Sequence, residues 1–214
     1  MSTDVQPSIV REPLEAVVIT GALAARPYRG PDYKAENAAL VALMGCLASD
    51  PASVLGLLVG RVMELTHAHS AGISIAEPAP EDPAAGPDGP CAVFRWRATA
   101  GAWAKYEGGT LPRHASPCGT VLQRGGPILM ARPERHYAIP PEMQPPIAEV
   151  LLVPFGARPR GSERPRLVGT VWALAHDLGK QFDREDLRII ESLAAFTAAA
   201  HQFLESGPTA ARAV

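Results

Sequence analysis

The stretch LVGTVWALAHD, residues 167–177, alternates in the manner of a β-strand with two different faces. Successive side chains of a strand point to opposite sides of a sheet. One face carries small apolar residues, Gly169, Val171, Ala173 and Ala175. The other face carries larger and polar residues, Thr170, Trp172, Leu174 and His176. The small face is suited to close packing against helices, and the tryptophan face is expected to line a pocket.

The neighbouring sequence predicts more strands of the same sheet. Residues 149–155 are strongly apolar and are separated from 167–176 by the polar turn GARPRGSERPR, so the two strands form a central hairpin. Residues 71–76 alternate between isoleucine and small residues and form another strand. The strand 91–99 follows after EPAPEDPAAGPDGP, residues 77–90, which is expected to be a long mobile connection.

Two helices are expected before the strands. The first spans 33–48, with Asp32 as its cap and a buried stripe made of Leu40, Leu43, Met44 and Leu47. The second begins at Asp50-Pro51, and its stripe is made of Leu55, Leu58, Val62 and Leu65. Residues 14–25 fit a short helix or a strand equally well, because Gly21 and Pro27 interrupt them.

A long helix closes the chain at residues 183–205, with Asp183 as its cap. It carries two apolar stripes. Leu187, Ile190 and Ala194 make one, and the other consists of Ile189, Leu193, Phe196, Ala200 and Phe203. Such a helix is either buried on two sides within one chain or shared between two chains of a dimer.

An irregular excursion lies between Gly101 and Gln144. It contains a short helix at 117–123, a short strand at 127–130 and the proline-rich loop ARPERHYAIPPEMQPP, residues 131–146. Long ordered excursions usually carry function. Within the loop, His136 and Tyr137 are either part of a lid over a ligand or part of a solvated surface.

Composition excludes several classes of protein. The 20 basic and 22 acidic residues leave a net charge of −2, and no basic stripe with interleaved aromatic residues marks a nucleic-acid surface. Three scattered cysteines, at positions 46, 91 and 118, cannot make a disulfide framework and favour a reducing cytoplasm. No signal peptide, transit peptide or membrane-spanning stretch is visible. The sequence therefore predicts a cytoplasmic protein that binds neither nucleic acid nor membranes.

Five stretches in this order resemble the GAF domain, in particular the GAF sensor modules at the N-terminus of bacterial two-component histidine kinases. They are AGISIAE (71–77), PRHASPCGTVL (112–122), LLVPFGARP (151–159), LVGTVWALAHD (167–177) and FDREDLRIIESLAAFTAAA (182–200), with RPYRGPDYKAENAALVAL (26–43) as a similar lead-in. The resemblance implies an α/β (α+β) fold. A central antiparallel sheet would carry the N- and C-terminal helices on one face and a pocket, covered by a loop and a short helix, on the other.

The pocket is expected to collect Trp96, Thr170, Trp172 and His176 from the strands. Tryptophans beside a threonine and a histidine suit a planar or apolar ligand with one polar end. The alternative is a second hydrophobic core that holds no ligand.

The stretch PRHASPCGT, residues 112–120, adds a second group of candidate residues. Ser116 and Pro117 begin a helix in the preferred way, which places Cys118 in the first turn, where the helix dipole favours the thiolate. Arg113 and His114 would reinforce this effect, and Gly119 leaves the first-turn N–H groups open to a ligand anion. The alternative is a well-capped helix start with a small buried cysteine.

Other activities of the GAF family find less in this sequence. Bilin-binding members carry histidine directly after the pocket cysteine, whereas Gly119 follows Cys118. Free methionine sulfoxide reductases need paired cysteines; Cys91 and Cys118 could pair, although the motifs of those enzymes are absent. The cyclic-nucleotide signature asparagine-lysine-phenylalanine-aspartate-glutamate is also absent. His67 and His69 lack the neighbouring ligands of a metal site.

Taken together, the sequence predicts an extension at 1–25 that is partly disordered, a GAF domain at 26–205 and a disordered tail at 206–214. No effector domain is expected in this chain. The expected function is that of a stand-alone sensory domain, which binds a small molecule or reports redox state and signals through a homodimer or a partner such as a histidine kinase. The cofactor and the ligand are not identified by the sequence.

Overall fold

Six strands form one antiparallel sheet in the order β3-β2-β1-β6-β5-β4. The computed structural model describes residues 11–79, 86–89, 92–157 and 166–206. The strands are β1 (Ser70–Glu77), β2 (Val93–Gly101), β3 (Thr110–Pro112), β4 (Ile128–Ala131), β5 (Glu149–Ala157) and β6 (Arg166–Ala175). β6 lies between β1 and β5, which confirms that the opening stretch is a central strand. Residues 80–85 and 90 of the connection predicted for 77–90, and residues 158–165 of the turn after β5, lie outside the described residues.

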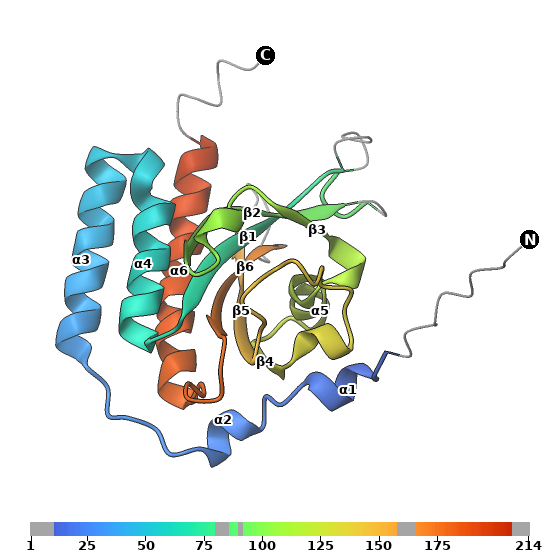
Figure 1. Ribbon diagram of the computed structural model, residues 1–214. Coiled ribbons are helices and arrows are strands. Elements are labelled where there is room, and N and C mark those ends of the chain that lie inside the picture. The colour runs from blue at the N-terminus through green and yellow to red at the C-terminus, as the bar shows by residue number, and fades with distance from the viewer. Residues whose placement is uncertain (1–10, 80–85, 90–91, 158–165, 207–214) are drawn as a thin grey trace, which may run out of the picture.

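Three helices cover one face of the sheet, as Figure 1 shows. They are α3 (Tyr33–Ser49), α4 (Val54–Thr66), which follows the short turn η1 (Pro51–Ser53), and α6 (Arg184–Ser206). The small face of β6 lies in the core beneath these helices, together with Leu43, Leu58, Ile190 and Leu193. The predicted α+β architecture, with terminal helices on one face, is therefore confirmed.

The helix caps follow the sequence closely. The Asp32 carboxylate accepts from the Ala35 N–H at 2.9 Å, and Asp183 accepts from the Glu185 and Asp186 N–H groups at 2.8 and 2.9 Å. The stripe predicted for the first helix is partly wrong. Met44 is 56% exposed, because α3 is the outermost helix and turns Glu36, Ala39 and Leu43 inward.

The opposite face of the sheet carries the excursion. It consists of η3 (Ala104–Tyr106), η4 (Arg113–Ala115), α5 (Pro117–Arg124), η5 (Pro133–Arg135) and the loops between them. These elements and the large face of β6 enclose a second hydrophobic core, which includes Phe94, Trp172, Leu174, Val121 and Tyr137. The sheet thus separates two cores, and α5 lies over β5 and β6.

Residues 11–29 form what we call the N-terminal strap. It contains the two short helices α1 (Leu14–Val17) and α2 (Ala22–Ala25), where the sequence left helix and strand open. It joins the free edge of β4 through a bridge between Val18 and Met130 and a hydrogen bond from the Ile19 N–H to the Leu129 carbonyl at 2.8 Å. In Figure 1 it continues in blue past α2 to the start of α3.

Two arginines anchor the far end of the strap. The Arg26 guanidinium binds both oxygens of the buried Glu149 carboxylate, at 2.9 and 2.6 Å. Arg29 binds Asp186 at 2.7 Å and the Leu65 carbonyl at 2.6 Å, so it joins α6 to α4. The strap therefore connects the excursion side of the sheet to the helical side.

Candidate functional site

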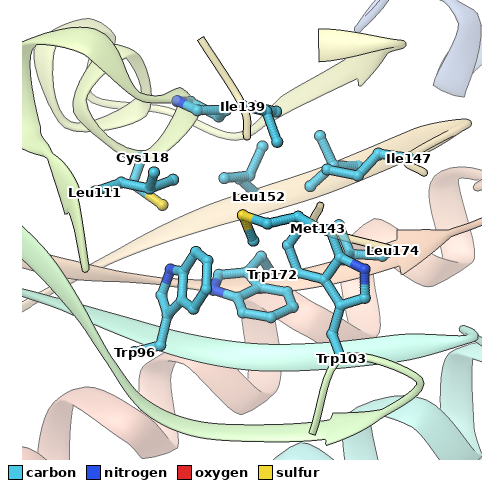
Figure 2. Close-up of a pocket in the computed structure, with 12 residues that line it drawn as sticks. Trp96, Trp103, Leu111, Cys118, Ile139, Met143, Ile147, Leu152, Trp172 and Leu174 are labelled. Atoms are coloured by element: carbon cyan, nitrogen blue, oxygen red, sulfur yellow. The ribbon is translucent and has the colours of Figure 1, made fainter. Parts of the chain in front are cut away.

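An apolar cavity of about 40 Å³ lies between the sheet and the excursion. Figure 2 shows its side chains converging from β2, β6, α5 and the proline-rich loop. It is lined by residues that are apolar and mostly buried: Trp96, Trp103, Leu111, Pro117, Cys118, Ile139, Met143, Ile147, Val150, Leu152, Trp172 and Leu174. The chain has three tryptophans, and all of them meet here.

The three indoles contact one another at tilted angles. The ring centroids of Trp96 and Trp172 are 6.3 Å apart at 68°, and those of Trp103 and Trp172 are 6.2 Å apart at 73°. Edge-to-face contacts of this kind are favourable because the positive edge of one ring faces the negative face of another. The cavity thus has aromatic walls that face in several directions.

Trp172 lies over the cross-strand glycine Gly72. A Cβ atom on Gly72 would come within 2.1 Å of the Trp172 ring, so only glycine leaves room for the indole. The Trp172 Nε1–H donates to the Ser74 hydroxyl at 2.9 Å, and this bond fixes the ring along β1. The stretch AGISIAE therefore shapes the floor of the cavity as well as the sheet.

Cys118 lines the cavity, but its environment differs from the expectation. The Thr170 hydroxyl donates to the sulfur at 3.2 Å, and the cysteine is buried. Burial raises the pKa of the Cys118 thiol, and the hydrogen bond from Thr170 offsets only part of that effect. The expected lowering of its pKa by the helix dipole is therefore wrong, because loss of water outweighs the dipole of an eight-residue helix.

The first turn of α5 is engaged within the protein. The Ser116 hydroxyl accepts from the Gly119 N–H at 3.3 Å, which confirms Ser116 as the cap. A Cβ atom on Gly119 would lie 1.7 Å from the Arg113 carbonyl oxygen. Gly119 is therefore needed for close packing of the backbone, and its N–H is not open to a ligand anion as the sequence suggested.

Arg113 and His114 lie away from the cavity. The Arg113 guanidinium forms an ion pair with Asp88 and donates to the Pro87 carbonyl. Together with His114 it lines a separate polar groove on the outer side of α5. The structure thus brings together Trp96, Cys118 and Trp172, and separates these two basic residues from them.

His176 directly follows the last residue of β6 and is not among the residues that line the cavity. Its ring stacks on Trp103 with a centroid distance of 6.0 Å. Its Nε2 lies 2.8 Å from the Ser70 hydroxyl and its Nδ1 lies 2.8 Å from the Pro146 carbonyl oxygen. Because Ser70 in turn accepts from the Trp103 N–H at 3.1 Å, His176 positions the tryptophan instead of lining the cavity.

The excursion supplies the residues that sequence reasoning missed, above all Trp103, Ile139, Met143 and Ile147. A tryptophan in the otherwise polar stretch 101–109 was the available signal for Trp103. The aliphatic residues of the proline-rich loop gave no signal, because the loop has no periodicity.

Metal binding finds no support in the described residues. Within them, no group of three or more histidine, cysteine, aspartate or glutamate side chains could hold a metal ion. His67 ends α4 in the left-handed conformation, and the His69 Nδ1 accepts from the His176 N–H at 3.0 Å. In the part of the chain that is described, no helix has both the length and the apolar character needed to cross a membrane.

The family model of the GAF domain matches residues 50–201. The chain belongs to the GAF domain family. No curated protein matches the sequence significantly. The match covers β1 to β6 and most of α6, and therefore includes every strand that contributes to the cavity of this GAF domain.

Solved structures support the same fold. The GAF domain of a phosphoenolpyruvate-protein phosphotransferase from Coxiella burnetii is 20% identical, with a TM-score of 0.60 and coverage of 80% of this chain and 95% of that chain. A free methionine-R-sulfoxide reductase from Neisseria meningitidis in complex with its substrate is 18% identical, with a TM-score of 0.54 and coverage of 84% and 95%.

A far-red-absorbing protein with bound biliverdin is 16% identical, with a TM-score of 0.55 and coverage of 80% and 99%. At these identities the comparisons establish the GAF fold and no particular activity.

Proposed function

We propose that this GAF domain is a sensory module that binds a small molecule in the tryptophan-lined cavity and passes the change to a second copy or a partner protein. The observation that carries the proposal is the meeting of all three tryptophans around one apolar cavity, on the sheet face opposite the helices. A concave apolar site with aromatic walls is the usual form of a small-molecule site. Redox sensing by Cys118 has less support, because burial raises the pKa of its thiol.

The sheet offers a direct route from the cavity to the helices. On β6, Trp172 and Leu174 contact the cavity, while Val171 and Ala173 pack in the core beneath the helices. Both cores are tightly packed, so a ligand that moves Trp172 changes how α6 packs against the sheet. The ligand acts as a population shift, because it binds better to one arrangement than to the other.

The N-terminal strap offers a second route. Glu12 forms an ion pair with Arg135, and its N–H donates to the Arg135 carbonyl at 2.9 Å. The ring Nδ1 of His136 lies 2.7 Å from the Glu12 carbonyl oxygen. At the other end, Arg29 binds Asp186 in the first turn of α6. A displacement of the excursion is therefore transmitted to α6 along both the sheet and the strap.

The output surface in this proposal is the outer side of the helices. Val41 and Met44 on α3 are each 56% exposed, and Phe203 on α6 is 54% exposed. Apolar side chains at such positions suit contact with a second copy or with a signalling partner such as a histidine kinase. Light scattering tests the dimer: a monomer at high concentration would exclude the homodimer and leave the partner protein. A cytoplasmic location forms part of the same proposal.

The site gives little support to the two alternatives, a free methionine sulfoxide reductase and a bilin-binding photosensor. A sulfoxide reductase needs an accessible thiolate, whereas Cys118 is buried and Cys91 lies outside the described residues. Bilin-binding members carry histidine directly after the pocket cysteine, whereas Cys118 is buried and is followed by Gly119. The enzyme and the photosensor are therefore less favoured than a sensor of a small apolar molecule.

Native mass spectrometry of freshly purified protein tests the proposed function. A retained small molecule of defined mass, released on unfolding, is the expected result. A purified protein with no bound species, whose thermal unfolding is unmoved by any member of a broad metabolite panel, would contradict it. Turnover of a sulfoxide with a dithiol, or visible absorption after incubation with a bilin, would favour the corresponding alternative.

A further inference from the structure

A second hollow lies directly outside the cavity. This outer groove has a volume of about 190 Å³ and is lined by the proline-rich loop, including Pro140, Pro141 and Gln144. The groove and the cavity share Trp103, Ile139, Met143 and Ile147. These four side chains therefore form the wall between the two spaces, and in Figure 2 Ile139, Met143 and Ile147 project from the loop above the indoles.

The loop that carries this wall is held to its surroundings almost entirely by side chains. Hydrogen bonds from side chains hold the backbone of three consecutive residues, Gln144, Pro145 and Pro146. The Tyr106 hydroxyl accepts from the Gln144 N–H at 2.8 Å, the Trp103 Nε1–H donates to the Pro145 carbonyl at 2.9 Å, and the His176 Nδ1 contacts the Pro146 carbonyl at 2.8 Å.

Main-chain hydrogen bonds hold the two ends of the loop instead. The Tyr137 N–H donates to Pro133, and the Ala148 N–H donates to the Ala175 carbonyl of β6, both at 2.8 Å. Between these ends, within the described residues, no main-chain hydrogen bond joins residues 138–147 to another element. The loop can therefore swing outward without loss of any sheet pairing.

The volumes of the cavity and the outer groove show that the loop must move before an aromatic ring can bind. An engineered apolar cavity of about 150 Å³ is large enough for benzene. The cavity of about 40 Å³ is much smaller, whereas the outer groove of about 190 Å³ lies just beyond Met143. Displacement of Met143 joins the two spaces into one that is large enough for an aromatic ring.

The chemistry of the walls restricts the ligand further. Three of the polar groups near the cavity are already bonded: Trp103 to Pro145, Trp172 to Ser74, and the Cys118 sulfur to Thr170. A charged ligand would lose its water and gain no partner, which is strongly unfavourable. Glu134 is the single charged residue among those that line the outer groove, and it is paired with Arg132 at 3.6 Å, so the mouth offers a carboxylate ligand no cation among its lining residues.

We propose that the ligand of this site is an uncharged aromatic compound of one or two rings, admitted when residues 138–147 open as a lid released by Tyr106 and by the movement of Met143. The tilted indoles favour an aromatic ring through edge-to-face contacts, and the Met143 sulfur adds a further favourable contact with it. This inference rests on the proposed function, because it names the ligand class and the access route of the same site.

The three tryptophans make the proposal directly measurable. In the full-length protein labelled with ¹⁵N, the three indole N–H signals all report on the site. Titration with unlabelled indole is expected to shift them. Indole-3-carboxylate has the same ring system with a negative charge, and at equal concentration it is expected to leave them unchanged.

The lid is tested with Tyr106→Phe, which keeps the ring and removes the latching hydroxyl. Its association rate for indole is expected to rise at least about fivefold, because the closed state loses both the hydrogen bond from the Gln144 N–H and the one that the hydroxyl donates to the Glu142 or Gln144 carbonyl. Met143→Ala shortens the wall and is expected to raise the same rate. Tyr28→Phe, at an exposed position of the N-terminal strap, is the matched control and is expected to bind indole like the wild type.

The outcomes separate the two proposals. If indole binds but neither variant changes the association rate, the lid is wrong and the sensory function stands. If indole-3-carboxylate binds as well as indole, the ligand class is wrong. If native mass spectrometry shows a bound ligand while neither indole nor its carboxylate binds, the aromatic class is overturned and the cavity keeps its function. An absence of every bound species contradicts the proposed function itself.

Discussion

The Thr170 hydroxyl donates its hydrogen bond to the sulfur of Cys118, across 3.2 Å of buried space between β6 and α5. The bond ties the short helix of the excursion to the central strand of the sheet. It also engages one lone pair of the sulfur.

Cys118 is expected to be unreactive in the folded protein, because burial raises the pKa of its thiol and excludes reagents. The protein with Cys46→Ser and Cys91→Ser keeps Cys118 as its single cysteine and isolates its signal. Labelling with a maleimide near neutral pH should be far slower than labelling of a free thiol and should become fast in urea. A variant that keeps the partly exposed Cys46 alone is the control. Labelling of folded Cys118 at the rate of a free thiol would contradict the prediction.

Gly72→Ala is expected to disturb the cavity, because the added Cβ would lie within 2.1 Å of the Trp172 ring. Overpacking of this kind usually costs about 1–3 kcal/mol of stability. Urea unfolding measures the loss, and the indole N–H spectrum should show the change at Trp172. Gly45→Ala on α3 is the matched control: nothing lies within 4 Å of its added Cβ, so the helix should be stabilised slightly. Equal effects of the two substitutions would exclude the packing explanation.

Arg26→Met is expected to destabilise the fold strongly, because it leaves the buried Glu149 carboxylate without its guanidinium partner. Breaking a buried ion pair on one side costs about 3–5 kcal/mol. The double variant Arg26→Met with Glu149→Gln removes the unpaired charge and should recover a large part of the loss. The measurement compares the free energies of unfolding of the wild type, the single variant and the double variant. No recovery in the double variant would mean that the ion pair is not the cause.

Acidification is expected to destabilise the protein through His176. Burial lowers the pKa of His176 below its ordinary value of 6.5; the Pro146 carbonyl opposes this, His69 adds to it, and Asp177 opposes it. Between the lowered pKa and 6.5, the unfolded chain binds more protons than the folded one, so stability is complete above this window and falls as the pH drops through it.

Urea unfolding between about pH 7.5 and about pH 5.5 measures the effect of His176. His176→Gln should show a smaller loss than the wild type. The loss should not vanish, because burial also lowers the pKa of His201. His114→Gln, at an exposed position, is the control and should follow the wild type. An unchanged pH dependence in His176→Gln would show that this histidine is not responsible.

Much of the fold could be predicted from local sequence, since strands and caps depend on neighbouring residues. The alternation of 167–176 predicted both faces of β6, and Asp32, Ser116 and Asp183 were recognised as caps. Met44 was misplaced, because helical periodicity does not show which stripe of an outer helix faces the protein.

The site could be predicted only in part, because its other half comes from residues without periodicity. Trp103 and Met143 enter the cavity from loops whose position depends on tertiary contacts. The reversed direction of the Cys118 pKa has the same origin, since helix position can be inferred from a capping motif but complete burial cannot.

The N-terminal strap has a practical consequence for where this domain begins. The family match starts at residue 50, yet Val17 and Leu23, well before it, are buried at 0% and 4% exposure. A fragment that began at residue 50 would expose the edge of β4 and would lack Arg26, the partner of the buried Glu149 carboxylate. Leu23 and Leu43 belong to the core beneath the helices, so a boundary drawn from sequence similarity alone would divide that core.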